Sequence, residues 1–281
     1  MAQQQQDMQF LFTLSTELEK NEVKLPSFPD AVIKIRDALE KDDCDIQRIA
    51  ELASLETALA SRLMQAANSA FYNPSGATVP DLRAAVMRLG LKEVRNMAIA
   101  LAVEQLFIAR ENPRIADDLS MLWRRSCALS SVAYVLAAEC APGVDPEQAF
   151  LCGLLHDVGK LYMLTKKEDF PHLFVDVAER SDANGAWFPQ VGKAITENWA
   201  FDETIVNSMT PLDTVSELGG AEPDLVDVVY AAELLCSASA DAPMDYEVIS
   251  ARRLQLSETR VEEIQPAIAL RMESMRQSLK G

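Results

Sequence analysis

The sequence predicts an all-α fold, and three observations support this. Apolar residues recur with the helical period of about 3.6 residues in nearly every segment of the 281-residue chain. The two-residue alternation of Val, Ile and Thr that is typical of strands is absent from the sequence, and aromatic residues make up only 6% of it. Hydrophobic residues account for 49% and charged residues for 25%, as in ordinary globular proteins, so the chain can bury a core without disulfides.

The first half should contain several helices, each ended by proline, glycine or a turn. The Leu25-Pro-Ser-Phe-Pro29 segment should be extended, because proline disfavours helix at the residue before it. Asp45 is predicted to cap one helix. Thr78 should cap another, with Met87 on its apolar face and Gly90 at its end. The predicted helices cover 10–18, 31–39, two stretches between 45 and 73, 78–90 and 92–109.

The second half should contain one long helix and several shorter ones. Asp117 or Asp118 is predicted to open the long helix, which runs to about Cys140. Asp145 then supplies an N-cap for a helix that is predicted to continue without a break to Leu164. The remaining predicted helices cover 171–179, 189–199, 204–209 and 224–236, with a loop over 211–223 and a last helix within 258–279.

The charge balance argues against two classes of function. The chain has 26 basic and 43 acidic residues, a formal net charge of -17, whereas general nucleic-acid binders and anionic-membrane binders need a basic surface. Its longest apolar stretches are too short to span a bilayer. Five cysteines without a CxxC pair, and an N-terminus without a basic flank or an apolar leader, predict a cytoplasmic protein.

Only two histidines are present, so few residues can carry imidazole chemistry. His156 lies next to Asp157 in an otherwise apolar helical segment. Burying an adjacent imidazole and carboxylate costs several kcal/mol unless each finds a partner or a metal ion. From the residues alone, these two form either a satisfied structural pair or a metal-binding or catalytic pair. His172 is expected to be an ordinary surface or partly buried histidine.

Two sets of motifs resemble a known family. The segment Gly153-Leu-Leu-His-Asp-Val-Gly-Lys160, after a long helix with Leu122-Trp123 near its start, resembles the core signature of the HD superfamily of metal-dependent phosphohydrolases. In the first half, the proline-flanked segment 25–29, the stretch 60–72 that ends in Ala-Asn-Ser-Ala-Phe-Tyr, and the segment 79–96 resemble the HDOD family, the HD-related output domain of bacterial signalling proteins.

The resemblance covers about residues 15–240 and implies a division of the chain. A helical N-terminal half (15–112) would pack on a degenerate HD-like helical core (113–240) in a multi-helix, all-α HDOD fold. A polar lead-in that includes the start of the first helix (1–14) would precede this domain. A linker and a C-terminal helix (241–281) would follow it.

The resemblance also implies which residues would hold a divalent metal ion in an active HD enzyme. The pair is present as His156 and Asp157. Arg125 stands two residues after Trp123, where the family has its first histidine, and Glu233 stands where an aspartate is expected. Arg125 would repel a divalent cation, and it could instead form a salt bridge with Asp157 or Glu233. We therefore expect a vestigial site without catalytic residues or cofactor, although His156, Asp157 and Glu233 leave room for a weakly bound divalent metal.

Three basic residues, Arg124, Arg125 and Lys160, are candidate contacts for a phosphate or another anion. The alternative for Lys160 is a solvated lysine that complements a helix C-terminus. A further group of residues follows a helix end in the first half. It forms either the junction between the two halves or a binding surface for a partner, with an aromatic anchor. Its members are Asn68, Ser69, Phe71 and Tyr72.

The resulting hypothesis is a stand-alone HDOD signal-transduction module that acts by binding a regulatory protein or a small phosphate-containing ligand. The alternative is a divalent-metal-dependent phosphohydrolase that acts on a nucleotide or cyclic dinucleotide. The last helix either docks on the body of the protein or mediates self-association, through an apolar stripe of Ile264, Ile268, Met272, Met275 and Leu279.

Overall fold

The computed structural model describes residues 10, 12–13, 15–16, 30–39, 45–107, 115–167, 187–209, 222–239 and 243–278. Every regular element within these ranges is a helix, so the all-α prediction is confirmed. The buried apolar side chains form one hydrophobic cluster that runs through both halves of the molecule. In this part of the chain, no helix is long and apolar enough to cross a membrane.

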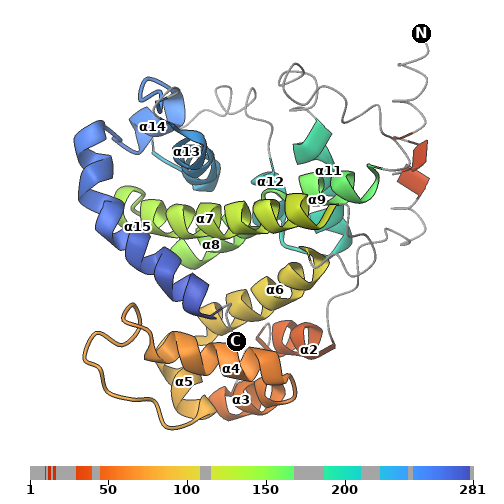
Figure 1. The fold of residues 1–281 in the computed structure, drawn as a ribbon, viewed down its shortest axis with the longest axis vertical. Coiled ribbons are helices and arrows are strands. Elements are labelled where there is room, and N and C mark those ends of the chain that lie inside the picture. Colours follow the sequence, from red (N-terminus) through yellow and green to blue (C-terminus); the bar gives the residue numbers. More distant parts are fainter. Residues whose placement is uncertain are drawn as a thin grey trace.

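The first half lies at the bottom of Figure 1 and consists of short helices packed around one another. α5 packs against α3, α4 and α6, and α2 packs against α3 and α6. α6 also contacts α7 and α8, and so connects this half to the second one. The helices are α2 (Asp30–Leu39), α3 (Ile46–Ser54), α4 (Thr57–Asn68), α5 (Leu82–Leu89) and α6 (Leu91–Phe107).

The second half is arranged around one long helix, α7 (Ala116–Cys140). α8, α13 and α15 pack against α7, and α9 packs against α11. α15 runs along the edge of the molecule from α14 down to α4, and so spans both halves (Figure 1). The other helices are α8 (Pro146–Leu155), α9 (Val158–Thr165), α11 (Trp187–Asn198), α12 (Glu203–Asn207), α13 (Leu225–Ser237), α14 (Ile249–Arg253) and α15 (Glu258–Ser278).

Several predicted helix ends are confirmed. The side chains of Asp45 and Asp145 each accept a hydrogen bond of 3.0 Å from the amide two residues later, at the starts of α3 and α8. α7 begins at Ala116, one residue before the earlier of the two predicted starts. Gly90 ends α5 with φ +82, a conformation that is easy only for glycine.

The prediction for the start of α5 is wrong. Asp81, and not Thr78, is the N-cap, because its carboxylate accepts a hydrogen bond of 2.8 Å from the Ala84 amide. Met87 is 61% exposed and does not lie on the apolar face that was predicted for it. At about 100° per residue, Met87 points to the side of the helix opposite to Ala85, Val86 and Leu89. The buried face consists of Ala85, Val86 and Leu89.

The predicted unbroken helix up to Leu164 is also wrong. α8 ends at Leu155 and α9 begins at Val158, with Asp157 at φ -91 and ψ 9 between them. His156 and Asp157 therefore lie at the junction of two helices and not within one. Apolar periodicity does not reveal this break, because the residues on both sides of it are buried and apolar.

The stretch that was predicted to be a linker before the last helix contains the short helix α14. α14 packs on α13, and Arg253 at its end pairs with the buried Asp227 of α13 at 3.1 Å. The segment at 25–29, the helix at 171–179 with His172, Leu279 and most of the loop at 211–223 lie outside the described residues.

Two glycines of the Gly153–Lys160 segment allow helices to cross closely. A Cβ atom on Gly153 would lie 2.8 Å from the Ser130 Cα atom of α7. A Cβ atom on Gly159 would lie 2.0 Å from the carbonyl oxygen of Phe188 in α11. Real Cβ atoms do not approach other atoms this closely, so both crossings require glycine. They fix α8 on α7 and α9 on α11, on either side of the His156–Asp157 junction.

Candidate functional site

The residues of the predicted HD site come together from three places in the second half. The junction of α8 and α9 supplies His156 and Asp157, α7 supplies Arg125, and α13 supplies Glu233. α7 packs against both α8 and α13, which brings the three segments to one point. The residues that the sequence grouped together are therefore neighbours in the fold.

Arg125 links the two carboxylates of this group. Its Nη1 atom donates a hydrogen bond of 2.9 Å to Oδ2 of Asp157, and its Nη2 atom donates to Oε1 of Glu233. The other oxygen of Asp157, Oδ1, accepts a hydrogen bond of 2.7 Å from Nζ of Lys160. The Asp157 side chain is fully buried, and each of its oxygens is paired with a cation. The salt bridge expected from the sequence is present, and it involves both carboxylates.

His156 has fewer contacts. Its Nε2 atom lies 3.7 Å from Oε2 of Glu233, which is too long for a hydrogen bond. Its Nδ1 atom and Oε2 of Glu233 are both buried and have no hydrogen-bond partner among the described residues. Burial lowers the pKa of His156, despite the nearby carboxylates of Asp157 and Glu233. The imidazole is therefore neutral near pH 7.

The charges in this group balance. Burial alone would raise the pKa of Asp157, but the charges of Lys160 and Arg125 outweigh it and hold the pKa below its usual range. Burial alone would lower the pKa of Arg125, but Asp157 and Glu233 outweigh it and raise the pKa. Two carboxylates and two cations form a closed network, in which Asp157 receives the compensation that a buried carboxylate needs.

A divalent metal ion does not fit these residues as they are arranged. Cations already pair with both oxygens of Asp157 and with one oxygen of Glu233, so a metal ion would have to compete with Arg125 and Lys160 for these carboxylates. The guanidinium of Arg125 lies between the two carboxylates, and its charge would repel a second cation. Among the described residues, no three His, Cys, Asp or Glu side chains are grouped so that they could hold a metal ion.

The candidate anion contacts differ in what they touch. Lys160 lies in the first turn of α9 and pairs with Asp157, so its interpretation as a solvated lysine at a helix C-terminus is wrong. Arg124 is exposed, and its Nε atom donates to the Ser120 carbonyl at 3.3 Å. Arg124 and Arg125 line a cavity of about 610 Å³ between α7, α13 and α15. Of the three basic residues, Arg124 alone has no carboxylate partner among the described residues.

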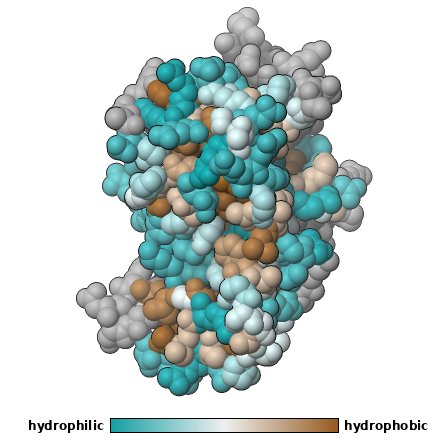
Figure 2. All heavy atoms as spheres, turned by 90° about the vertical axis from the view of Figure 1, so that its left-hand side faces the viewer, coloured by the Kyte–Doolittle hydropathy of each residue, from teal (hydrophilic) through white to brown (hydrophobic). Residues whose placement is uncertain are grey.

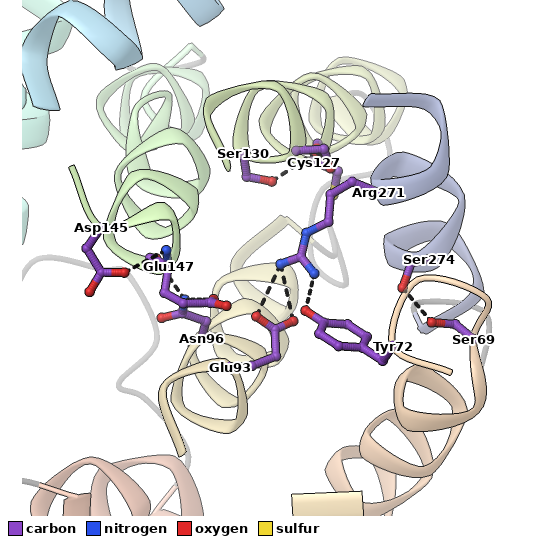
Figure 3. A network of polar contacts seen from close by, with 11 residues as sticks. Ser69, Tyr72, Glu93, Asn96, Cys127, Ser130, Asp145, Glu147, Arg271 and Ser274 are labelled. Carbon is purple, nitrogen blue, oxygen red and sulfur yellow. Dashed lines mark hydrogen bonds and ion pairs between the residues drawn. The ribbon is translucent and has the colours of Figure 1, made fainter. Parts of the chain in front are cut away.

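The residues at the end of α4 lie at the junction between the halves. Asn68 accepts a hydrogen bond of 2.9 Å from the Val79 amide, and so holds the start of the next segment. The hydroxyl groups of Ser69 and Ser274 are 3.0 Å apart, which links α4 to α15 (Figure 3). The rings of Phe71 and Tyr72 pack edge to face, with centroids 4.8 Å apart, beside α15.

The residue at the centre of this junction was not among the predicted ones. Arg271 of α15 is only 2% exposed, and it points into the space between Glu93 and Tyr72 (Figure 3). Its position in the apolar stripe was a usable signal, because it lies three residues after Ile268 and four residues before Met275. Both of these residues are buried. A charged residue within the apolar stripe of a helix indicates a buried charge that has partners.

Comparisons with known proteins identify both a family and a fold. A model of the HDOD domain family matches residues 25–213. A curated protein from Treponema pallidum, described as uncharacterised, is 22% identical over 200 residues. The match covers 66% of this chain and 37% of that protein, so the chain spans well under half of the length of this curated relative.

Three crystal structures share the fold. A "putative metal-dependent phosphohydrolase" from Shewanella amazonensis is 23% identical, with a TM-score of 0.77 over 98% of this chain and 99% of that one. An HDOD domain protein of unknown function from Geobacter sulfurreducens is 24% identical, with a TM-score of 0.64 over 96% and 88%. A "putative signal transduction protein" from Marinobacter aquaeolei is 20% identical, with a TM-score of 0.63 over 92% and 59%. At these identities the likeness concerns the fold alone.

Proposed function

We propose a function from one premise: this chain belongs to the HDOD domain family. In this proposal the protein is a regulatory module that acts by binding a partner, and its HD site holds no metal ion and catalyses no reaction. The proposal includes a cytoplasmic location, which is favoured by the free thiols of the four described cysteines.

The observation that carries the proposal is the placement of Arg125. In an active HD enzyme, a divalent ion neutralises the carboxylates and activates water. Here the guanidinium of Arg125, together with Lys160, supplies the positive charge that Asp157 and Glu233 require. An arginine supplies charge and five N–H donors, but it has no open coordination position for water or a phosphate oxygen. The site is therefore stable without an ion, and its remaining role is to hold α7, α8, α9 and α13 together.

A second candidate is a metal-dependent phosphohydrolase, and one observation favours it. Nδ1 of His156 and Oε2 of Glu233 are buried without hydrogen-bond partners among the described residues, and buried polar atoms usually have one. The Arg125 side chain is 28% exposed, so it has a path toward solvent. If it swung out, His156, Asp157 and Glu233 would present nitrogen and oxygen ligands to a divalent ion.

Metal content distinguishes the two candidates. Untagged protein is exposed to manganese, iron, nickel, zinc or magnesium, desalted, and assayed by elemental analysis. We expect the wild-type protein to retain far less than one ion per chain. Arg125→His should retain nearly one ion per chain, because the substitution removes the repelling cation and adds an imidazole ligand. The double variant R125H/D157A should lose it again.

A matched control lies next to Arg125 in the chain. Arg124→His makes the same substitution at an exposed position that does not touch the carboxylates, and it should leave the metal content at the wild-type level. Near-stoichiometric metal in the wild-type protein that falls on Asp157→Ala would contradict the proposal. That result would support the phosphohydrolase and justify a screen of nucleotide substrates.

A further inference from the structure

The cavity beside the HD site is the strongest unassigned feature of the molecule. Its volume of about 610 Å³ lies within the range of about 300 to 1,000 Å³ that is usual for small-molecule sites. Its walls come from α7, α13 and α15 and from the segment just before α14. Apart from two arginines and Gln265, the side chains that line it are aliphatic, aromatic or sulfur-containing.

The wall that α7 contributes has a basic end and an apolar end. Arg124 and Arg125 lie at one end, Ala128 lies about one turn after them, and Val132 lies about two turns after them. Residues spaced in this way share one face of a helix. At 1.5 Å per residue, Val132 lies about 10 Å beyond Arg125 along the helix axis. The cavity therefore offers a charged contact and an apolar contact within the length of a small molecule.

Of the two arginines, Arg124 has a charge that is available to a ligand. Arg125 is already paired with Asp157 and Glu233. Arg124 donates through Nε to the Ser120 carbonyl, and its two Nη groups have no hydrogen-bond or ion-pair partner among the described residues. No acidic residue of the described chain lines the cavity, although the protein has 43 acidic residues against 26 basic ones. The cavity thus presents one uncompensated positive charge.

Apolar side chains in the walls of the cavity are open to solvent. Met272 belongs to the apolar stripe of α15, but it is 40% exposed, whereas Ile268, about one turn earlier, is buried. Leu235 and Cys236, near the end of α13, are half-buried. On the face that carries α15, apolar residues lie in patches among polar ones (Figure 2). An apolar group that covered the exposed wall would gain free energy by removing it from water.

We propose that this cavity binds a small amphipathic carboxylate, whose head group pairs with Arg124 and whose apolar chain lies against Val132 and Met272. A guanidinium can donate two parallel hydrogen bonds to one carboxylate, and one positive charge matches one negative charge. A phosphate monoester carries about 1.5 to 2 negative charges near pH 7. Its additional charge would have no cation of its own, because Asp157 and Glu233 already occupy Arg125.

A ligand in this cavity would connect helices from different parts of the chain. α7 lies within the segment 25–213 that the HDOD family model matches, whereas α13 and α15 lie outside it. A molecule that contacts all three favours the arrangement in which they are packed together, since binding stabilises the state that binds. This inference goes beyond the proposed function and does not depend on it, because no metal ion and no partner protein takes part.

The test is isothermal titration calorimetry of the full-length protein with sodium octanoate. We expect saturable binding of one octanoate per chain. Octanol has the same chain without the charge, and acetate has the same head group without the chain, so each should bind at least about tenfold more weakly. Octyl phosphate should also bind more weakly than octanoate, because its additional charge is not compensated.

The charged contact is tested by Arg124→Gln. This substitution removes the charge at an exposed position, and it should weaken the binding of octanoate at least about tenfold while leaving the binding of octanol unchanged. Arg83→Gln is the matched control, because Arg83 is an exposed arginine of α5 that does not line the cavity. It should bind octanoate as the wild-type protein does.

The apolar contact is tested by Met272→Trp. The larger side chain takes up space in the cavity and should weaken the binding of both octanoate and octanol at least about tenfold. Met87→Trp is the matched control, at a position of α5 that is 61% exposed and does not line the cavity. Circular dichroism checks that each variant is folded, and Arg124→Gln alone still tests the proposal if Met272→Trp is not.

Four results would overturn the proposal. Octanoate could give no saturable binding, or octanol could bind as tightly as octanoate. Folded Arg124→Gln or Met272→Trp could bind octanoate as the wild-type protein does, which would place the bound molecule elsewhere. Octyl phosphate could bind more tightly than octanoate, which would exclude a carboxylate as the preferred head group. These measurements involve no metal ion, so their failure is distinguishable from failure of the proposed HD-site function.

Discussion

Arg125 and Arg271 each lie beside acidic side chains at a junction of helices, but their surroundings differ. Arg125 is 28% exposed, and it shares Asp157 with a second cation, Lys160. Arg271 is 2% exposed and is the cation that pairs with Glu93. It lies within an aromatic cage formed by the rings of Phe71, Tyr72, Tyr134 and Phe150. The first lies within the second half of the fold, and the second joins the two halves.

The difference shows two ways in which one residue type can compensate buried carboxylates. At the HD site, the charge of Arg125 compensates Asp157 and Glu233, and Lys160 adds a second cation. At the cage, the hydrogen bonds and the stacking of a guanidinium both contribute, so no simple ion could replace it. We therefore expect the first region to tolerate substitution better than the second.

The largest effect should come from Arg271→Ala. Removing one partner of a buried ion pair leaves an uncompensated charge, here on Glu93, and typically costs about 3 to 5 kcal/mol. The free energy of unfolding, measured with urea, should fall by about this amount. The exposed variant Arg276→Ala is the control and should leave it nearly unchanged. A small loss for Arg271→Ala would mean that the cage contributes little to joining the halves.

Arg125→Ala should have a smaller effect, of about 1 to 3 kcal/mol. Asp157 keeps its hydrogen bond from Lys160, and solvent can reach the space that the guanidinium leaves. The same urea titration measures this variant. A loss as large as that of Arg271→Ala would contradict the expected difference between the two regions, because it would show that both arginines contribute equally to stability.

The pH dependence of stability should distinguish the regions further. Burial, and then the charge of Glu93, raise the pKa of Glu147 to about 9. A carboxyl group whose pKa is higher in the folded state than in the unfolded one stabilises the protein fully below its unfolded pKa, and this contribution is lost as the pH rises through the folded pKa. Glu147→Gln should therefore become more stable relative to the wild-type protein as the pH rises from 5 to 9.

Urea titrations at several pH values measure this difference. Glu197→Gln, at an exposed position of α11, is the matched control and should show no such trend. A constant difference between Glu147→Gln and the wild-type protein over this pH range would show that Glu147 does not titrate within it.

The smallest effect should come from Ser274→Ala. The hydroxyl groups of Ser69 and Ser274 form one buried hydrogen bond between α4 and α15, and neutral hydrogen bonds of this kind contribute about 1 kcal/mol. The measured quantity is again the free energy of unfolding. A loss comparable to that of Arg271→Ala would show that the serine pair, and not the cage, is the main contact between α15 and the first half.

Much of the fold could be predicted from the sequence, because helix periodicity and caps are local signals. Asp45 and Asp145 could be identified as caps from their own positions, and Gly90 as a helix end. The break at Asp157 could not, because the residues on both sides of it are buried and apolar, so the apolar period continues across it. The start of α5 at Asp81 was missed because two residues with capping side chains lie close together in the sequence.

The residues of the candidate sites could also be predicted only in part from the sequence. His156, Asp157, Arg125 and Glu233 could be grouped from the sequence alone, because a family pattern connects them. No such pattern connects Arg271 with Glu93 or Tyr72, and the cage depends on contacts between residues far apart in the chain. Apolar periodicity correctly placed Ile264, Ile268 and Met275 in the buried stripe on α15, but Met272, also predicted there, is 40% exposed. It did not identify the charge within the stripe.

The separation of Glu93 and Arg271 along the chain has a consequence during synthesis. The two residues are 178 positions apart, so at a translation rate of about 5 to 20 residues per second, Arg271 is made roughly 10 to 35 s after Glu93. Toward the end of that interval the nascent chain already contains every residue of the cage but not the arginine that fills it. A ribosome-bound chain would thus carry Glu93 without its counter-charge until α15 is made, so the two halves can be joined at this point only at the end of synthesis.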